Sequence, residues 1–294
     1  MKDRKNILLQ TTIPYIEDDW HVARFSELQK HLESITDSSG AQLYNVTARN
    51  REVDEQGSDP LLRELDKSDF NELWLFAVDS GDGLSTAECE AITRFRRLGR
   101  GLLSSRDHMD LGSSLCTIGG VGLAHHFHTK NPDPNEAQRM RDDPETLTID
   151  YPNYHSGSNG DYQIVRPADP VHELLRRGDG TTIEYFPAHP HEGSVSAVPD
   201  DPSSHVIATG TSTATGNGFN LIVAFEKSRD SHGNDLGRAI AESSFHHFVD
   251  YNWDTDLGCP SGLTEKPGNG IKEDLHRLDD VKRYVTNVAR WLAD

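Results

Sequence analysis

The sequence predicts an α/β protein with a doubly wound, mostly parallel central sheet that has helices on both faces. Residues 72–78 form a continuous apolar run, which is typical of a central strand covered on both sides. Strand and helix patterns alternate through the first 110 residues. A capping box at 85–88 opens a helix between the runs 72–78 and 101–105. These two runs are therefore predicted to be adjacent, parallel inner strands joined by a right-handed crossover.

The other elements follow from apolar periodicity and turn residues. Near the N-terminus the pattern predicts a strand at 6–12, a helix at 17–35, a strand at 41–47 and a helical turn opened by Asp59 and Pro60. Later strands are predicted at 181–186, 204–209, 219–225 and 237–244, and a last helix at 273–292. We expect a single domain, 1–294, with a long loop-rich insertion at about 125–165.

Charge and composition restrict the partners. The 294 residues include 29 Lys and Arg against 48 Asp and Glu, a net charge of −19, which repels phosphate backbones and anionic lipid. We therefore expect a small-molecule substrate, no nucleic acid and no membrane, and leave a homodimer open. The three cysteines do not form a disulfide framework, and the apolar run at 7–9 is too short for a signal peptide. A cytoplasmic location follows as an expectation.

Polar side chains follow two of the predicted strands. Ser105, Arg106 and His108 come at the end of 101–105, and His246 and His247 come at the end of 237–244. Parallel strands present their carboxyl ends at one edge of a sheet, so both groups are expected to open on one crevice. In that crevice Arg106 and Ser105 are predicted to hold the substrate.

A histidine with a carboxylate three residues further on suits general acid/base chemistry near neutral pH. Asp250 stands in that position after His247. We therefore predict His246, His247, Asp250 and His108 as catalytic residues, and the sequence does not decide whether His246 or His247 faces the crevice.

Other histidines lie in loops. His125 and His128 have a helical ligand spacing, but they lack the paired partners of a metal site, so we expect no tightly bound metal and no cofactor. His125 and His155 are predicted to contact the substrate. The sequence His189-Pro190-His191-Glu192, directly after the strand at 181–186, is a further candidate for the same rim.

Two stretches, Leu73 to Leu103 and Gly237 to His247, resemble the trehalose-utilisation (ThuA-like) family of the class I glutamine amidotransferase-like superfamily. The resemblance implies the flavodoxin-like fold of that superfamily and a link to trehalose utilisation and other carbohydrate metabolism. This chain departs from the family at the turn after 101–105, where Ser104-Ser105-Arg106 replaces Gly-x-His. No cysteine fits the position of the amidotransferase nucleophile.

Two functions remain open at this point. The first is an enzyme that acts on a small polar substrate, such as a carbohydrate or keto-sugar derivative, by histidine acid/base chemistry without a cysteine nucleophile. The alternative is a non-catalytic ligand-binding or interaction protein on a degenerate amidotransferase-like fold. An enzyme requires the groups at 106–108 and 246–250 to lie within side-chain reach of one another.

Overall fold

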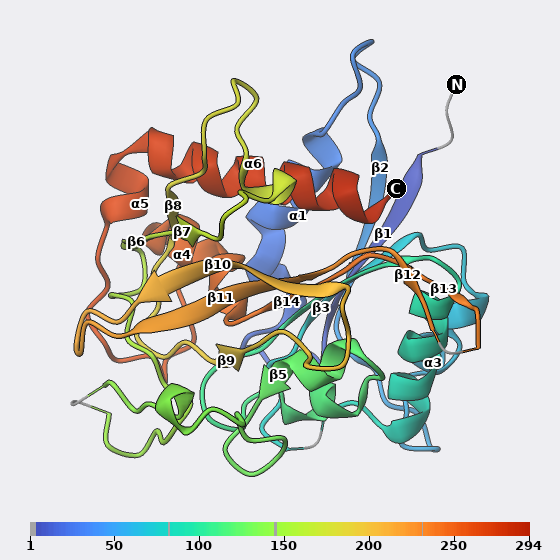
Figure 1. The fold of residues 1–294 in the computed structure, drawn as a ribbon, viewed down its shortest axis with the longest axis horizontal. Helices are drawn as coiled ribbons and strands as arrows, with labels where there is room; N and C mark the ends of the chain where they lie inside the picture. The colour runs from blue at the N-terminus through green and yellow to red at the C-terminus, as the bar shows by residue number, and fades with distance from the viewer. Residues whose placement is uncertain (1–3, 82, 144–145, 231) are drawn as a thin grey trace.

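The computed structural model describes residues 4–81, 83–143, 146–230 and 232–294 (Figure 1). Three residues of the segments discussed above, Asp82, Pro144 and Glu145, lie outside this description. The core is an eight-stranded sheet with the order β2-β1-β3-β4-β14-β11-β10-β7. The strands are β1 (Lys5–Thr11), β2 (Tyr44–Arg49), β3 (Glu72–Phe76), β4 (Gly101–Ser105), β7 (Arg166–Pro167), β10 (Ser204–Thr211), β11 (Gly218–Phe225) and β14 (Ala239–Glu242).

Five neighbouring strands, β2, β1, β3, β4 and β14, run parallel. Their order along the sheet is the 2-1-3-4-5 order of flavodoxin-like folds. β11, β10 and β7 extend the sheet as antiparallel strands. β3 pairs with β1 on one side and with β4 on the other, which confirms the prediction for 72–78 and 101–105.

Helices cover both faces of the sheet. α1 (Ser26–Ser34) and α6 (Leu275–Leu292) lie on one face, and α2 (Pro60–Arg63) and α3 (Thr86–Arg97) lie on the other (Figure 1). Successive side chains of β1 alternate between the two faces, so Ile7 and Leu9 join the apolar core beneath α1 and α6 while Leu8 joins the core beneath α3. None of the helices in the described ranges has the length and apolar character needed to cross a bilayer.

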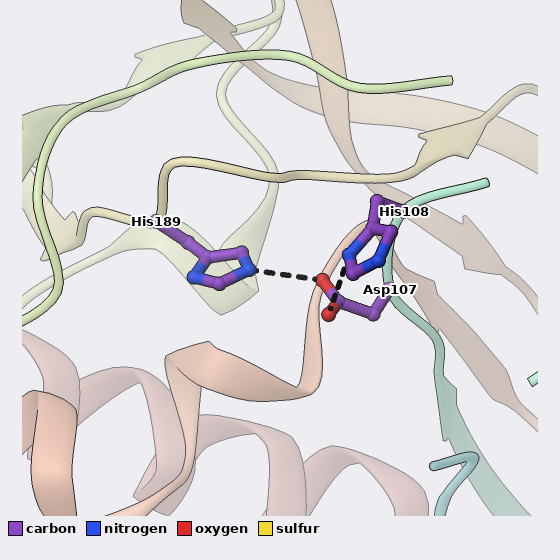
Figure 2. Close-up of side chains that lie close together, drawn as sticks. All are labelled: Asp107, His108 and His189. Carbon is purple, nitrogen blue, oxygen red and sulfur yellow. Dashed lines mark hydrogen bonds and ion pairs between the residues drawn. The ribbon is translucent and has the colours of Figure 1, made fainter. Parts of the chain in front are cut away.

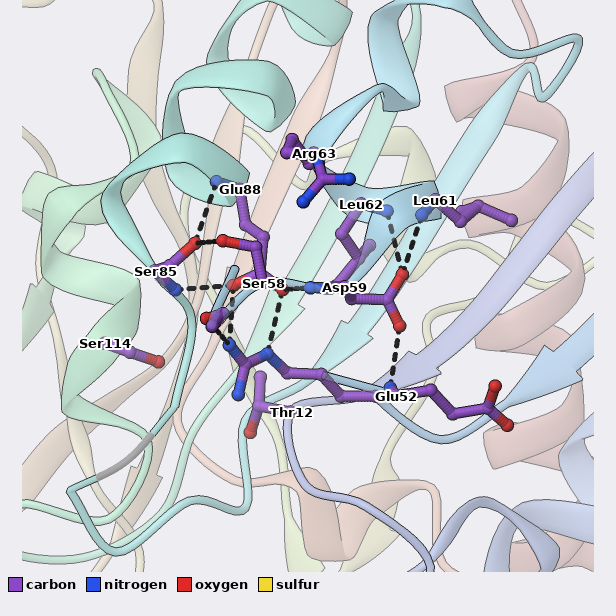
Figure 3. A network of polar contacts seen from close by, with 12 residues as sticks. Thr12, Glu52, Ser58, Asp59, Leu61, Leu62, Arg63, Ser85, Glu88 and Ser114 are labelled. Carbon is purple, nitrogen blue, oxygen red and sulfur yellow. Dashed lines mark hydrogen bonds and ion pairs between the residues drawn. The ribbon is translucent and has the colours of Figure 1, made fainter. Parts of the chain in front are cut away.

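The predicted capping box is present at the start of α3. Ser85 Oγ accepts from the Glu88 amide, and Glu88 accepts from the Ser85 amide. The Glu88 carboxylate also accepts two hydrogen bonds of 2.9 Å from the Arg51 guanidinium and one of 2.7 Å from the Asp59 amide (Figure 3). Asp59 in turn caps α2 by accepting from the Leu61 and Leu62 amides. A buried, fully hydrogen-bonded network thus joins α2, α3 and the segment after β2.

Several boundaries differ from the prediction. The first helix starts later than 17, as a 3-10 turn at Val22–Phe25 that continues into α1. The strand expected at 181–186 is β8 (Tyr185–Pro187), and the last helix is split into α5 (Gly270–Glu273) and α6. β14 stops at Glu242 because Ser244 caps a 3-10 turn at Phe245–His247, before α4 (Asp250–Trp253). The strands β10 and β11, predicted at 204–209 and 219–225, pair as an antiparallel hairpin.

The described strands of the segment 125–165 lie outside the central sheet, which the chain joins directly afterwards at β7. It contains β5 (His125–His126), which pairs with β9 (Ser194–Val195), and β6 (Tyr162–Ile164), which pairs with β8. A further two-stranded ribbon is formed by β12 (Ser228–Arg229) and β13 (Asp235–Leu236). Tyr154 and Glu192 form an isolated bridge, so the middle of the long segment lies beside the chain that follows β8.

Candidate functional site

The carboxyl ends of β4 and β14 meet at one edge of the sheet. Glu242 pairs with Ser105 at the last register position of the two strands. The chain stays joined beyond this point, because the Phe245 amide donates to the Arg106 carbonyl at 2.8 Å. Asp107 and His246 therefore leave neighbouring strands at the same place.

A third segment is fixed against this edge by Gly193. Its amide donates to the Ser243 carbonyl at 3.0 Å. A Cβ atom at Gly193 would lie 2.5 Å from the Asp107 carbonyl oxygen and 2.8 Å from the Ser243 carbonyl oxygen, so the close approach requires glycine. This contact carries His189 and His191 to the ends of β4 and β14.

The carboxylate of Asp107 is the centre of the site. His189 Nε2 lies 3.1 Å from Oδ1, and His108 Nδ1 lies 3.1 Å from Oδ2 (Figure 2). His246 Nε2 lies 3.8 Å from Oδ2, and Ser244 Oγ donates to Oδ1 at 3.3 Å. Asp107, His189 and His246 are buried, whereas the His108 side chain retains 21% of its exposure and forms the solvent side.

Two asparagine amides fix which ring nitrogens of His189 and His246 carry hydrogen. Asn252 Nδ2 donates to the Ala188 carbonyl at 2.9 Å and to Asn159 Oδ1 at 3.0 Å. Because a backbone carbonyl can only accept, this pair sets the orientation of both amides. Asn159 Oδ1 then accepts from His189 Nδ1 at 2.8 Å, and Asn252 Oδ1 accepts from His246 Nδ1 at 3.1 Å. In the neutral rings both Nε2 atoms consequently present lone pairs toward Asp107.

Burial and neighbouring charges shift the pKa values of the groups in the cluster in different directions. Burial lowers the pKa of His189 to about 4, although Asp107 opposes this. Burial, followed by the neighbouring His189, holds the pKa of His246 well below its usual value. For Asp107, burial acts to raise the pKa, but His189 and His108 outweigh it and hold the pKa well below the ordinary value. The carboxylate is thus ionised at neutral pH.

His247 belongs to a separate buried network. Its Nδ1 lies 3.1 Å from Glu242 Oε2 and its Nε2 lies 3.2 Å from Glu192 Oε2. Burial disfavours the charged ring, but Glu192 and Glu242 outweigh it and raise the pKa of His247 to about 10. Tyr284 donates to the other oxygen of Glu242. His247 is therefore an imidazolium held between two carboxylates, and His246 is the histidine that lies beside Asp107.

Asp250 has a different position from the one expected. Its carboxylate accepts from the Ser26 amide at 3.1 Å, the Ser26 hydroxyl at 2.8 Å and the Glu27 amide at 2.8 Å, so it binds the N-terminus of α1. The imidazoles take Asn252 and Glu242 as their Nδ1 partners instead. The turn at 245–247 directs Asp250 away from the cluster, so this carboxylate does not orient either ring.

Arg106 and Ser105 are both buried beneath the site. The Arg106 guanidinium donates to the Met109 and His126 carbonyls and lies 4.0 Å from the centroid of the Phe127 ring. Burial lowers the pKa of Arg106 to about 9. Ser105 is fully buried, and its hydroxyl has no partner in the described part of the chain. The structure therefore places Arg106 in a packing role beneath the cluster.

The two other predicted contact residues lie apart from Asp107. His125 is buried, and its Nε2 lies 2.8 Å from Ser104 Oγ. Burial holds the pKa of His125 well below its ordinary value. His155 is half-buried and donates from Nδ1 to the Pro190 carbonyl at 3.2 Å, so it flanks the segment that carries His189.

A second group of ionisable side chains adjoins the first. His191 Nε2 lies 2.8 Å from Glu265 Oε1, and its Nδ1 lies 3.7 Å from Asp143 Oδ2. The His191 ring centroid lies 5.4 Å from that of His108 and 5.6 Å from that of His189. Here one imidazole lies between two carboxylates, with its Nδ1 3.2 Å from Asn153 Oδ1, whereas around Asp107 one carboxylate faces several imidazoles.

Two surface cavities lie elsewhere. One of about 610 Å³ is lined by residues of α1, α6 and the turn at 177–179, and one of about 1160 Å³ lies beside the N-terminus of β1. Neither is lined by a residue of the Asp107 cluster. At the cluster itself, the half-buried Trp20 packs its ring against His246, with centroids 4.8 Å apart.

The sequence does not single out Asp107 as the central residue, and it indicates His189 only as a candidate for the rim. Both residues carry a local signal, since each stands two positions after a strand end. Their meeting depends on the Gly193 contact, which joins segments more than 80 residues apart and leaves no pattern in the sequence.

Comparisons with known proteins give distant structural neighbours only. No family model and no curated protein matches the chain. A cytoplasmic protein of Salmonella typhimurium has 11% identity and a TM-score of 0.42, covering 81% of this chain and 87% of that one. The glutaminase domain of a Trypanosoma brucei CTPS with bound acivicin has 12% identity and a TM-score of 0.44, covering 90% and 97%. The ThuA-like resemblance therefore stays a prediction.

Proposed function

We propose that this protein is an enzyme that transfers a proton on a small polar substrate at the Asp107 cluster, without a cysteine nucleophile. One observation carries the proposal: a buried carboxylate is surrounded by three imidazoles at the carboxyl edge of a parallel sheet. Ligands of doubly wound folds bind at this edge. An imidazole held by a carboxylate suits general acid/base catalysis near neutral pH.

The position of His108 suits direct contact with a substrate. It is the exposed member of the cluster, and its Nδ1 contacts the Asp107 carboxylate. Asp107 would stabilise the charge that forms on the ring when His108 takes a proton from a substrate hydroxyl or an acidic C–H bond. His246 and His189 form the buried wall behind it.

An uncharged, hydroxyl-rich substrate fits these surroundings better than an anion. The guanidinium of Arg106 is fully buried and donates to two carbonyls, so it is not presented to a carboxylate or phosphate of a substrate. Trp20 adds an aromatic wall beside His246, which is typical of small-molecule sites. Together with the ThuA-like resemblance, this supports a carbohydrate or keto-sugar derivative as the substrate.

The test is a proton-NMR assay in D₂O with uncharged disaccharides, sugar lactones and keto-sugars. The intact protein should convert one of them or exchange one of its C–H protons for deuterium. Asp107→Asn and His108→Gln should each lower the rate about 100- to 10,000-fold, the usual contribution of a general acid or base. His205→Gln, an exposed histidine, and Cys116→Ser should leave it unchanged.

Two outcomes would contradict the proposal. Full activity in Asp107→Asn would remove the cluster from the reaction. Saturable sugar binding by the wild type without turnover, unchanged in His108→Gln, would instead support the non-catalytic binding protein.

A further inference from the structure

We propose that Asp107, His108 and His189 bind one divalent transition-metal ion. The inference rests on the proposed function in that it places a metal at the same site. One ligand atom from each of the three residues lies within 4.8 Å of the other two (Figure 2). Ligand atoms around one zinc ion lie roughly 3–4 Å apart, so a small rotation of the rings completes the set.

The orientation of the rings indicates a missing positive charge between them and the carboxylate. His189 and His246 both use Nδ1–H for an asparagine oxygen, so both Nε2 lone pairs point toward Asp107. His189 Nε2 is buried and has no hydrogen-bond partner in the described part of the chain, although Asp107 Oδ1 is 3.1 Å away. A lone pair facing a carboxylate is repulsive unless a proton or a metal ion lies between them.

The stacking of His189 on His246 argues against a proton on both rings. The two ring centroids are 3.6 Å apart with an interplanar angle of 10°. Two imidazolium rings at this separation would repel each other strongly in a buried site. A single metal ion satisfies the Asp107 carboxylate and the His189 lone pair without charging either ring.

The outer hydrogen bonds match those of metal-binding histidines. A ligating imidazole donates its other N–H to a fixed oxygen, which sets the tautomer and the ring orientation. Asn159 Oδ1 performs this task for His189, and Asn159 is itself held by Asn252. The fold itself thus supplies the hydrogen bond that orients His189. It brings Asn252, which follows β14, against Asn159 of the long segment 125–165.

The donor set indicates the class of ion. Imidazole nitrogens suit zinc, iron, nickel and copper, whereas magnesium and calcium prefer oxygen ligands alone. Two histidines and one carboxylate leave open positions for water and a substrate oxygen, as in catalytic metal sites. Metal-bound water ionises near neutral pH, so it would perform the proton transfer while His108 becomes a ligand.

The neighbouring group, Asp143, His191 and Glu265, also has three ligand atoms within 4.8 Å. It is the weaker candidate, because His191 Nε2 and Glu265 Oε1 already contact each other at hydrogen-bond distance, 2.8 Å. This group provides the matched control for the first.

The experiment is calorimetric titration of ZnCl₂ into tag-free, chelator-treated protein of residues 1–294, with Co²⁺ absorption spectra as a second readout. The wild type should bind about one equivalent, and tetrahedral or five-coordinate Co²⁺ bands should appear. Asp107→Asn and His189→Gln should weaken binding at least about 100-fold, and Asn159→Ala about 10- to 100-fold. His191→Gln and His205→Gln should bind as the wild type does. Circular dichroism melts check that each variant is folded.

Three results would overturn the inference: no zinc binding by the wild type, unchanged binding in folded Asp107→Asn, or loss of binding in His191→Gln alone. Activity separates this inference from the proposed function. Sugar turnover by a protein that binds no zinc would sustain the proposed function and overturn the metal site. Tight zinc binding without turnover of any sugar would do the opposite.

Discussion

Two buried carboxylates, Glu88 and Asp107, have opposite surroundings. Each Glu88 oxygen accepts two hydrogen bonds, from the Arg51 guanidinium and from the amides of Asp59 and Ser85 (Figure 3). Asp107 has one hydroxyl donor, at 3.3 Å, and three imidazoles, two of which turn lone pairs toward it. Glu88 finds all of its hydrogen-bond donors within the protein, whereas Asp107 requires a further donor or a cation.

The difference corresponds to position in the fold. The Glu88 network joins α2 and α3 on one face of the sheet, where its task is structural. The Asp107 cluster lies at the carboxyl edge of β4 and β14, where ligands of such sheets bind. A buried charge without sufficient donors costs stability, so its persistence at this edge indicates a function.

The largest effect is expected from breaking the complete network. Glu88→Gln leaves the buried Arg51 guanidinium without its carboxylate and should destabilise the fold by about 3–5 kcal/mol in urea unfolding. Glu90→Gln, an exposed change on the same helix, is the control and should have little effect. A loss below about 1 kcal/mol would show that the network is not the structural element described above.

Glu72 is a third buried carboxylate, with fewer hydrogen-bond donors than Glu88. It is buried at the amino end of β3, far from the ligand-binding edge, with Trp74 Nε1 as the donor to one oxygen only. Burial raises its pKa to about 8. The folded state therefore holds this proton more tightly than the unfolded chain does. The contribution of Glu72 to the free energy of unfolding consequently falls as the pH rises from about 4.5 to about 8.

Glu72→Gln removes this penalty. The variant should be more stable than the wild type by about 2–4 kcal/mol at pH 8.5 and equal to it near pH 4, because the wild-type carboxyl is then protonated. Urea unfolding at the two pH values measures the difference. A pH-independent difference would show that Glu72 does not titrate in the folded protein.

Asp107→Asn should change stability in the opposite direction from Glu88→Gln. The amide can donate to the Nε2 lone pair of His189, so the chelator-treated variant should gain about 1–2 kcal/mol. In a domain of this size that is roughly 2–8 °C in Tm by calorimetry. A fall in Tm comparable to that of Glu88→Gln would show that Asp107, like Glu88, stabilises the fold.

The smallest effect is expected at the edge of the Glu88 network. Ser85→Ala removes the N-cap of α3 and the 2.7 Å contact with Ser58 Oγ, which should cost about 1 kcal/mol. Ser85→Thr keeps the cap and should recover most of the loss. Equal stability of the two variants would show that the cap contributes little here.

The sequence predicted the parts of the fold that depend on local patterns. The strand at the apolar run 72–78 and the capping box at Ser85 both occur as expected, because each is decided by neighbouring residues. The first helix was placed too early, since 17–21 carries polar residues that apolar periodicity does not test.

The sequence predicted only the part of the site that strand order determines, namely that two strand ends lie next to each other. The ends of β4 and β14 do meet, as parallel pairing requires. The partners of His247 and Asp250 were not predictable, because Glu192, Ser26 and Glu27 lie 50 to more than 220 residues away along the chain. A carboxylate three residues from a histidine is its partner only if the backbone keeps both on one side, and the turn at 245–247 does not.

The position of β14 has a consequence for synthesis of the chain. β14 lies between β4 and β11, and it is the last strand of the sheet to be made. Until residue 242 has emerged, the edge of β4 has no partner on that side and can pair with another chain. At ~5–20 residues per second this interval lasts roughly 7–30 s. A nascent chain of this protein therefore passes through a long aggregation-prone stage, and chaperone demand should be highest just before β14 leaves the ribosome.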